Sequence, residues 1–474
     1  MKKERLVLNN IYIEGVAAEG KAIAHAKLPT ESAEATARVL FVEYAVPGDL
    51  VDVLVTKRKK NYLEGRLERI VSPSPHRLKP FCEHFELCGG CKWQHLPYDM
   101  QLEAKQRQVY DQLVRLGHLE VPEINPTIGS EKTVEYRNKL EFSASDHRWI
   151  KADEEAEALS DKERMGLGFH VGRYFDKVLD IKHCHLQKEP SNAIRLFIKK
   201  YALDNDIPFY NLRENTGVLR NMFIRTTEDG QVMLILCFGR DFEGREPMLE
   251  AIAEAFPQIS SFYYVINTKL NDSINDQQCI LYKGDEAIYE TMENLHFKIG
   301  PKSFYQTNAP QALNLYRVAR DYASLNGTQT VYDLYTGTGT IAQFVSSRAK
   351  KVIGIEYVPE AIEDAKANAR LNSIDNCEFL AGDMKDILTD DFIKEHGKAD
   401  VIILDPPRAG IHPDVAQVIL NAEPEIIVYV SCNPASQARD LEILCQKYRI
   451  SDVQPVDMFP HTHHVENVCR LVKK

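Results

Sequence analysis

From residue 320 onward, apolar strand patterns alternate with helical patterns, and this alternation limits the fold more than any other feature of the sequence. Strand patterns begin near Thr330, Lys351, Cys377, Ala399 and Glu425. Strands separated by helices form βαβ units, in which the strands lie parallel in one sheet. Ligands of such sheets bind at the carboxyl ends of the strands. We therefore expect an α/β domain whose functional residues directly follow its strands.

The composition is that of an ordinary globular protein. The chain has 474 residues, of which 44% are apolar and 27% charged. Domains usually have about 100–200 residues, so this length suggests about three domains. No apolar stretch approaches the roughly 18 residues that span a bilayer, and the N-terminus lacks a secretory signal, so we expect a cytoplasmic protein. Ten cysteines then indicate metal binding, catalysis or core packing rather than disulfides. The net charge of −11 argues mildly against a nucleic-acid partner.

The first half of the chain has a different pattern. Residues 1–70 show short strands with turn signals and no convincing helix, which predicts a small β-barrel. The basic run 57–60 in this segment fits either a phosphate-binding surface or a solvated hairpin tip. A helix is predicted over 99–117, capped by Asp99 and ended by Gly117. Its apolar stripe is formed by Leu102, Val109, Leu113 and Leu116. Residues 133–295 are strand-rich, with a charged, exposed insertion at 151–164.

A glycine-containing loop follows the first strand of the α/β segment. It reads Asp333-Leu334-Tyr335-Thr336-Gly337-Thr338-Gly339-Thr340, and Glu356 ends the next strand, 23 residues after Asp333. An acid there can accept hydrogen bonds from ribose hydroxyls. The third glycine of a dinucleotide site and the Gly-Lys-Ser/Thr of a phosphate loop are both missing, which favours S-adenosylmethionine, a nucleoside without phosphate; a generic βα turn is the structural alternative. Asp383, after the third strand, fits a contact to the adenine amino group or a helix cap.

The fourth and fifth strands end in reactive groups. Asp405, followed by two prolines, ends the fourth strand. Cys432, in Ser431-Cys432-Asn433-Pro434, ends the fifth strand beside a predicted helix start, where the helix dipole favours a thiolate. Cys432 is therefore the nucleophile candidate, whereas Cys445 and Cys469 fit inert core positions.

A thiol and a methyl donor together suit methylation of carbon 5 of uracil. Carbon 5 is a poor nucleophile until a thiolate adds to carbon 6, and a base must then remove the carbon 5 proton before the thiol leaves. Glu466, just before the last apolar strand, is the base candidate. The nearby His461, His463 and His464 lack a clear fourth metal ligand and fit hydrogen bonding or substrate contact better.

Three cysteines cluster near residue 85. Cys82, Cys88 and Cys91 have the spacing C-x5-C-x2-C, and Cys184 lies far downstream. Structural zinc sites usually show paired C-x2–4-C knuckles. Three clustered cysteines and a remote fourth therefore favour an iron–sulfur cluster over zinc, with chance clustering as the third alternative.

Taken together, these motifs resemble the RNA uracil-5-methyltransferase family, specifically its iron–sulfur 23S rRNA branch, over nearly the whole chain. The resemblance implies an N-terminal TRAM domain that binds RNA and a [4Fe-4S] cluster held by Cys82, Cys88, Cys91 and Cys184. It also implies Cys432 as nucleophile and Glu466 as base. The implied cofactor contacts are Gln306 of the Phe-x-Gln-x-Asn motif, Tyr335, Glu356 and Asp405, beside the Asp383 inferred above. Relatives often show Phe-Cys and Asn where this chain has Tyr335-Thr336 and Thr340.

We therefore expect an α/β protein in three parts: a TRAM-like, OB-like β-barrel at 1–72, a central α+β iron–sulfur domain at 73–295 and a Rossmann-like class I methyltransferase domain at 296–474. The expected function is methylation of a uridine in 23S rRNA by a monomer without membrane contact. Alternatives are the same chemistry on tRNA, an amino-group methyltransferase, and an RNA-binding protein without turnover. Arg408 argues against the amino-group enzyme, because those enzymes carry an aromatic residue there to stack the base.

Overall fold

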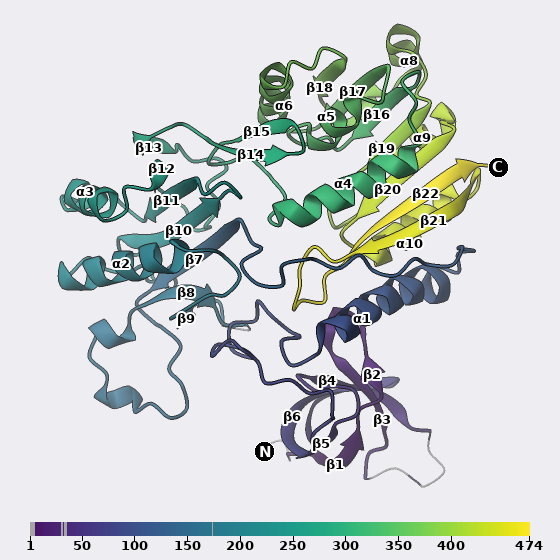
Figure 1. Cartoon of the computed structure of the whole chain (residues 1–474). Helices are drawn as coiled ribbons and strands as arrows, with labels where there is room; N and C mark the ends of the chain where they lie inside the picture. Colours follow the sequence, from purple (N-terminus) through teal and green to yellow (C-terminus); the bar gives the residue numbers. More distant parts are fainter. Residues whose placement is uncertain (1–4, 30–31, 33–35, 173) are drawn as a thin grey trace.

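The computed structural model describes the whole chain except residues 1–4, 30–31, 33–35 and 173. Figure 1 shows a curled N-terminal sheet at the bottom, a central sheet at the left and a C-terminal sheet at the upper right. Within the described residues, no helix is both long and apolar enough to cross a membrane. The architecture is mixed α/β, as predicted.

The N-terminal sheet has six strands in the order β1-β5-β6-β4-β3-β2. The elements are β1 (Val7–Tyr12), β2 (Gly15–Val16), the 3-10 turn η1 (Ala18–Gly20), β3 (Ala22–Ala26), β4 (Arg38–Glu43), β5 (Leu50–Arg58) and β6 (Tyr62–Ser72). Because β1 also contacts β3, the sheet curls around one apolar core that includes Leu40, Val53 and Leu63. This is the small β-barrel that the short strand patterns predicted.

Helix α1 (Tyr98–Tyr110), extended by the π-helical turn η2 (Asp111–Leu116), joins the barrel to the rest of the protein. Val109 and Leu113 are fully buried in the core of the C-terminal domain, so the helix packs on that domain. Two predictions about this helix were wrong. Asp99 lies inside the first turn and makes no cap, because the helix begins one residue earlier after Pro97, and Leu116 is 68% exposed because the π turn rotates it away from the core.

The central sheet has seven strands in the order β13-β12-β11-β10-β7-β8-β9. Its elements are β7 (Lys139–Ser145), β8 (Gly166–His170), β9 (Val178–Asp180), α2 (Ser191–Asp204), β10 (Leu219–Thr226), β11 (Val232–Phe238), α3 (Arg245–Ala255), β12 (Ile259–Ile266) and β13 (Ile280–Gly284). The 151–164 stretch contains two short 3-10 turns, η3 (Ala156–Ala158) and η4 (Lys162–Arg164), and is largely exposed, as expected of an insertion. The hairpin β14 (Ile288–Met292) and β15 (Leu295–Ile299) leads to the last domain.

The C-terminal sheet has the order β18-β17-β16-β19-β20-β22-β21. Its elements are α4 (Ala309–Ala323), β16 (Thr330–Leu334), α5 (Thr340–Ser346), β17 (Lys351–Glu356), α6 (Pro359–Leu371), β18 (Cys377–Ala381), α7 (Met384–Ile387), α8 (Asp390–His396), β19 (Val401–Leu404), α9 (Pro413–Ala422), β20 (Ile426–Ser431), α10 (Pro434–Leu444), β21 (Tyr448–Val456) and β22 (Glu466–Lys473). β16 to β20 run parallel, which confirms the predicted βαβ pattern.

The last strand enters this parallel sheet in the opposite direction. β22 pairs antiparallel with β20, with Ser431 opposite Asn467, and also with β21, with Val456 opposite Glu466. Extending the β20–β22 register by one residue sets Cys432 opposite Glu466. The strand end where parallel-sheet ligands bind is thus also the place where β22 begins.

Candidate active site

The loop after β16 is shaped by left-handed backbone conformations at Tyr335 (φ 65°), Gly337 (φ 55°) and Gly339 (φ 76°). Glu356, at the end of β17, accepts the Gly337 N–H at 3.2 Å and the Val358 N–H at 3.1 Å. Glu356 therefore fixes the loop from the neighbouring strand, in the place that sequence analysis gave to a ribose-binding acid.

Asp333 holds the same loop from inside. Its carboxylate accepts the Thr336 hydroxyl at 2.5 Å and the Ala342 N–H at 3.0 Å. Burial and the nearby Asp405 carboxylate raise the pKa of Asp333, whereas the Thr336 hydrogen bond lowers it, and the net pKa is about 7. Sequence analysis used Asp333 only to mark the end of the strand, and its bracing role follows from contacts within the folded loop.

The other predicted cofactor contacts lie near this loop. Gln306 is half-buried just before α4, and its carbonyl accepts Asn138 Nδ2 at 2.9 Å. Asp383 caps the short helix α7 by accepting the Lys385 N–H at 3.2 Å, which is the structural alternative weighed above. Asp405 directly follows β19, and burial raises its pKa to about 7.

Cys432 lies between the end of β20 and the first turn of α10, where Asn433 caps the helix. The sequence predicted that the helix N-terminus would favour the thiolate. In the free protein, burial and then the Glu466 carboxylate raise the pKa of Cys432, while the Arg408 guanidinium, which hydrogen-bonds the thiol, lowers it; the net pKa is about 11. The thiol of the free protein is therefore protonated at neutral pH.

Glu466 is 6% exposed at the first position of β22. Burial and the Asp405 carboxylate raise its pKa to about 8, while Arg408 lowers it. Arg408 Nη2 also lies 2.7 Å from His464 Nδ1, and burial lowers the pKa of His464 to about 3, so this imidazole is neutral and accepts the hydrogen bond. The structure thus brings the predicted nucleophile, the predicted base and Asp405 together around Arg408.

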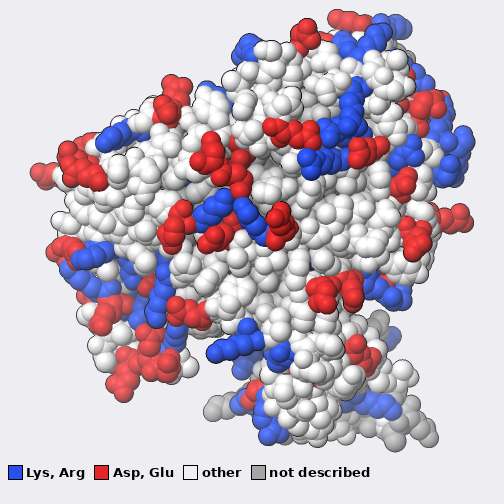
Figure 2. Space-filling model, in the orientation of Figure 1, with Lys and Arg blue, Asp and Glu red and all other residues white. Residues whose placement is uncertain are grey.

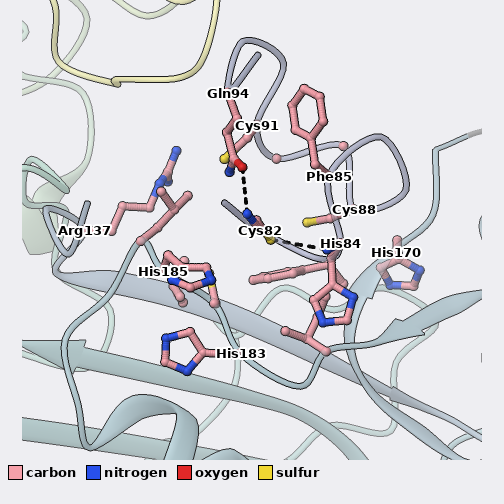
Figure 3. Close-up of a pocket in the computed structure, with 17 residues that line it drawn as sticks. Cys82, His84, Phe85, Cys88, Cys91, Gln94, Arg137, His170, His183 and His185 are labelled. Carbon is pink, nitrogen blue, oxygen red and sulfur yellow. Dashed lines mark hydrogen bonds between the residues drawn. The ribbon is translucent and has the colours of Figure 1, made fainter. Parts of the chain in front are cut away.

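The four predicted cluster ligands line one cavity of about 400 Å³. Figure 3 shows Cys82, Cys88 and Cys91 on one loop, and Cys184 reaches the cavity from the segment after β9. Burial raises the pKa of Cys88 to about 12 and that of Cys91 to about 11, and the neighbouring thiols raise both further. Four thiolates at this place would need a cationic partner. In the described part of the chain, no three His, Cys, Asp or Glu side chains are arranged to hold a single metal ion.

Of the two glycines in the loop after β16, Gly339 is the one that is tightly packed. A Cβ there would come within 2.8–2.9 Å of Phe379 and Ala365, and its φ of 76° disfavours other residues. We predict that Gly339→Ala weakens binding of S-adenosylhomocysteine at least about tenfold, because the loop must shift. Isothermal titration calorimetry would measure this. Gly327→Ala is the matched control, since it has the same backbone class (φ 92°) and open space around its Cβ. Equal affinities for both variants would contradict the assigned loop.

Two family descriptions match the chain. Residues 275–474 match the tRNA (Uracil-5-)-methyltransferase family, and residues 10–67 match the TRAM domain. The first match covers the whole C-terminal sheet, including the strand ends that carry Cys432 and Glu466. The second covers most of the curled N-terminal sheet.

Relatives of nearly full length carry the same description. A Porphyromonas gingivalis protein described as an uncharacterized RNA methyltransferase is 58% identical over 92% of this chain and 95% of its own length. A Bacteroides thetaiotaomicron protein of the same description is 54% identical over 96% of this chain and 99% of its own. The Pyrococcus abyssi tRNA (uracil-54, C5)-methyltransferase, solved with S-adenosyl-L-homocysteine, has a TM-score of 0.73 and 27% identity over 99% of this chain and 100% of its own. The chain is therefore an RNA methyltransferase that belongs to the uracil-5-methyltransferase family and carries an N-terminal TRAM domain.

Proposed function

We propose that this enzyme uses S-adenosylmethionine to methylate carbon 5 of a specific uridine in 23S rRNA, with Cys432 as nucleophile and Glu466 as base. The observation that carries the proposal is the β20–β22 register, which sets a thiol opposite a buried carboxyl group. Both groups lie at the carboxyl ends of the parallel strands, where ligands of such sheets bind. The supported activity, RNA uracil-5 methylation, calls for a nucleophile at carbon 6 and a base for the carbon 5 proton, and this pair can supply both.

The mechanism follows from what each side chain can do. The Cys432 thiolate adds to carbon 6 of uracil, and the electrons of the carbon 5–carbon 6 double bond move into an enolate. Carbon 5 then takes the methyl group from the sulfonium donor, which leaves as a neutral thioether. Glu466 removes the remaining carbon 5 proton, the double bond re-forms and the thiolate is expelled. Arg408 hydrogen-bonds the thiol and lowers its pKa, so we assign it to stabilise the thiolate.

The cofactor site we propose is formed by Gln306, Tyr335, Glu356, Asp383 and Asp405. S-adenosylmethionine supplies an electrophilic methyl group and a positive charge. Asp405 and Glu466 are carboxyl groups whose pKa values burial raises to about 7 and about 8, and a bound cation would favour their ionised forms. This electrostatic fit supports a cationic methyl donor, as does the solved Pyrococcus abyssi relative with S-adenosyl-L-homocysteine.

We propose that Cys82, Cys88, Cys91 and Cys184 hold a [4Fe-4S] cluster within a central domain of residues 73–295. The donor set fits, because four thiols share one cavity, burial raises the pKa of each, and a cationic partner would favour their thiolate forms. A cluster spreads its ligands around several iron atoms, whereas zinc draws four ligands around one point. In this proposal, residues 1–72 form the RNA-binding barrel and 296–474 the catalytic domain, and the enzyme is a cytoplasmic monomer.

The substrate RNA has two candidates. The cysteine quartet and the N-terminal barrel favour 23S rRNA through the family resemblance alone, whereas the Pyrococcus abyssi relative is a tRNA methyltransferase, so tRNA is the second candidate. On the face drawn in Figure 2, cations and carboxylates are interspersed, in keeping with the net charge of −11. We therefore expect RNA contact at local basic groups such as the exposed run 57–60 on the barrel.

We predict that 23S rRNA, and not tRNA, accepts labelled methyl groups when total RNA from a strain lacking this enzyme is the substrate. The product is mapped by nuclease digestion and mass spectrometry. One methylated uridine in 23S rRNA is the expected result, and heat-inactivated protein is the control. Label found only in tRNA would overturn the rRNA assignment and leave the uridine chemistry in place.

We predict that Glu466→Gln traps the enzyme on its RNA. Glutamine keeps the size of Glu466 but cannot take the carbon 5 proton, so methyl transfer occurs and the covalent adduct persists. A denaturing gel would show a slow band that carries both protein and methyl label.

The control for this experiment is Cys432→Ala, which cannot form the band and should lose methyl transfer at least about 1,000-fold while still binding RNA. If Glu466→Gln releases methylated RNA at the parent rate, another group is the base. If Cys432→Ala turns over normally, the covalent mechanism is wrong.

We predict that protein purified without oxygen is brown and contains about four iron atoms and four sulfides per chain. Cys88→Ser should lose most of this iron, because burial disfavours an unpaired replacement ligand. Cys445→Ser, at the half-buried end of α10, is the matched control and should keep the iron. One zinc and no iron per chain in the parent protein would refute the cluster.

A further inference from the structure

The loop of residues 457–465 joins β21 to β22 and leads directly into Glu466. Its carbonyl groups are held by donors from separate parts of the chain. Asn308 Nδ2 donates to Met458 O (3.0 Å), Lys105 Nζ to Phe459 O (3.1 Å), Tyr136 OH to Pro460 O (3.0 Å), and the Lys92 and Trp93 N–H groups to His461 O (2.8 and 3.0 Å). Four consecutive carbonyl groups are thus held from four places: the Phe-x-Gln-x-Asn motif, helix α1, the segment before β7, and the segment that follows Cys91.

A fully buried ion pair lies at the start of this loop. Lys105 Nζ lies 2.5 Å from Asp457 Oδ1, and both side chains are 0% exposed. Asp457 also accepts the Tyr98 hydroxyl at 2.8 Å and the Phe459 N–H at 2.9 Å. Burying two charges is costly and stabilises a fold little more than apolar packing would, but it specifies one geometry. This pair therefore fixes the position of the 457–465 loop against α1.

The pair also lies next to the base in the sheet. Asp457 directly follows Val456, and Val456 is the β21 residue opposite Glu466. The contacts that hold Asp457 therefore also hold the end of β21, and Glu466 pairs with the last residue of that strand. His464, which takes the Arg408 hydrogen bond, lies at the far end of the same loop.

Gln101, one helical turn before Lys105, holds the turn in the middle of the loop. Its Oε1 accepts the His461 N–H at 2.8 Å, and its Nε2 donates to Trp93 O and Leu96 O at 3.0 and 2.8 Å. His461 has a left-handed backbone (φ 63°), a conformation that a non-glycine residue keeps only when its surroundings enforce it. Gln101 helps to hold His461 in this conformation. Through its bond to Trp93 O, it also ties the turn to the segment that follows Cys91.

We propose that Lys105 and Gln101 of α1 are positioning residues for proton removal, which hold the 457–465 loop so that Glu466 meets the carbon 5 proton. The proposal rests on the assignment of Glu466 as the base. It gives α1 a catalytic purpose beyond joining the barrel to the catalytic domain. Neither residue touches the reacting atoms, so each acts through the loop.

The experiment measures single-turnover methyl transfer and the fraction of methylated RNA that remains covalently bound. The variants are Gln101→Met and the charge-neutral double variant Lys105→Met with Asp457→Asn, because Lys105→Met alone leaves a buried charge unpaired and can fail to fold. Arg107→Met is the matched control, since it removes an exposed cation from the same helix. Circular dichroism and S-adenosylhomocysteine affinity verify that each variant is folded.

We expect both variants to release methylated RNA about 10- to 100-fold more slowly than the parent, and the bound methylated adduct to accumulate as it does in Glu466→Gln. Arg107→Met should behave as the parent does. If folded variants release product at the parent rate, or lose methyl transfer and release in equal proportion without adduct, α1 does not position the base. If Glu466→Gln itself forms no adduct, the proposed function fails instead, so the two failures are distinguishable.

Discussion

The antiparallel entry of β22 into an otherwise parallel sheet is the constraint on which the site depends. A parallel sheet alone gathers only strand C-termini at its ligand edge. Because β22 runs the other way between β20 and β21, it brings a strand N-terminus to that edge. The residue after Ser431 and the residue before Asn467 then face each other, and these are the thiol and the carboxyl group. A strand register thus sets side by side two residues that are 34 positions apart in the chain, and we propose that they form the reacting pair.

The buried carboxyl groups at the ligand-binding edge of the C-terminal sheet favour a positively charged ligand. Burial raises the pKa values of Asp333 and Asp405 to about 7 and that of Glu466 to about 8, so the free site holds carboxyl groups near their titration points. The same burial keeps Cys432 protonated, with a pKa of about 11. Under our proposal, the positive charge of the bound methyl donor adds to that of Arg408 and shifts these groups toward their ionised forms, so the nucleophile and the base become competent mainly in the loaded site.

Much of this could be predicted from the sequence, because the signals are local. Five strand starts were predicted within two residues of their place, since apolar runs alternate with helical patterns there. Cys432 was singled out because it directly follows an apolar strand, and Glu466 because it directly precedes one. The bracing contacts were not predicted: Lys105 and Asp457 are 352 positions apart, and nothing local marks a lysine as buried. The predictions that Asp99 caps the helix and that Leu116 is buried were wrong. The helix begins one residue earlier than predicted, and a π turn at its end changes the direction of Leu116.

The covalent pair is tested most directly in the parent enzyme, with RNA whose uridines are replaced by 5-fluorouridine. Fluorine takes the place of the proton that Glu466 must remove, so the reaction should stop after methyl transfer with the RNA attached. Proteolysis and mass spectrometry of the trapped complex would then locate the bond. The account predicts one adduct, on the peptide that contains Cys432, carrying both the methyl group and the fluorinated nucleotide. An adduct on any other cysteine, or methylated RNA without an adduct, would contradict it.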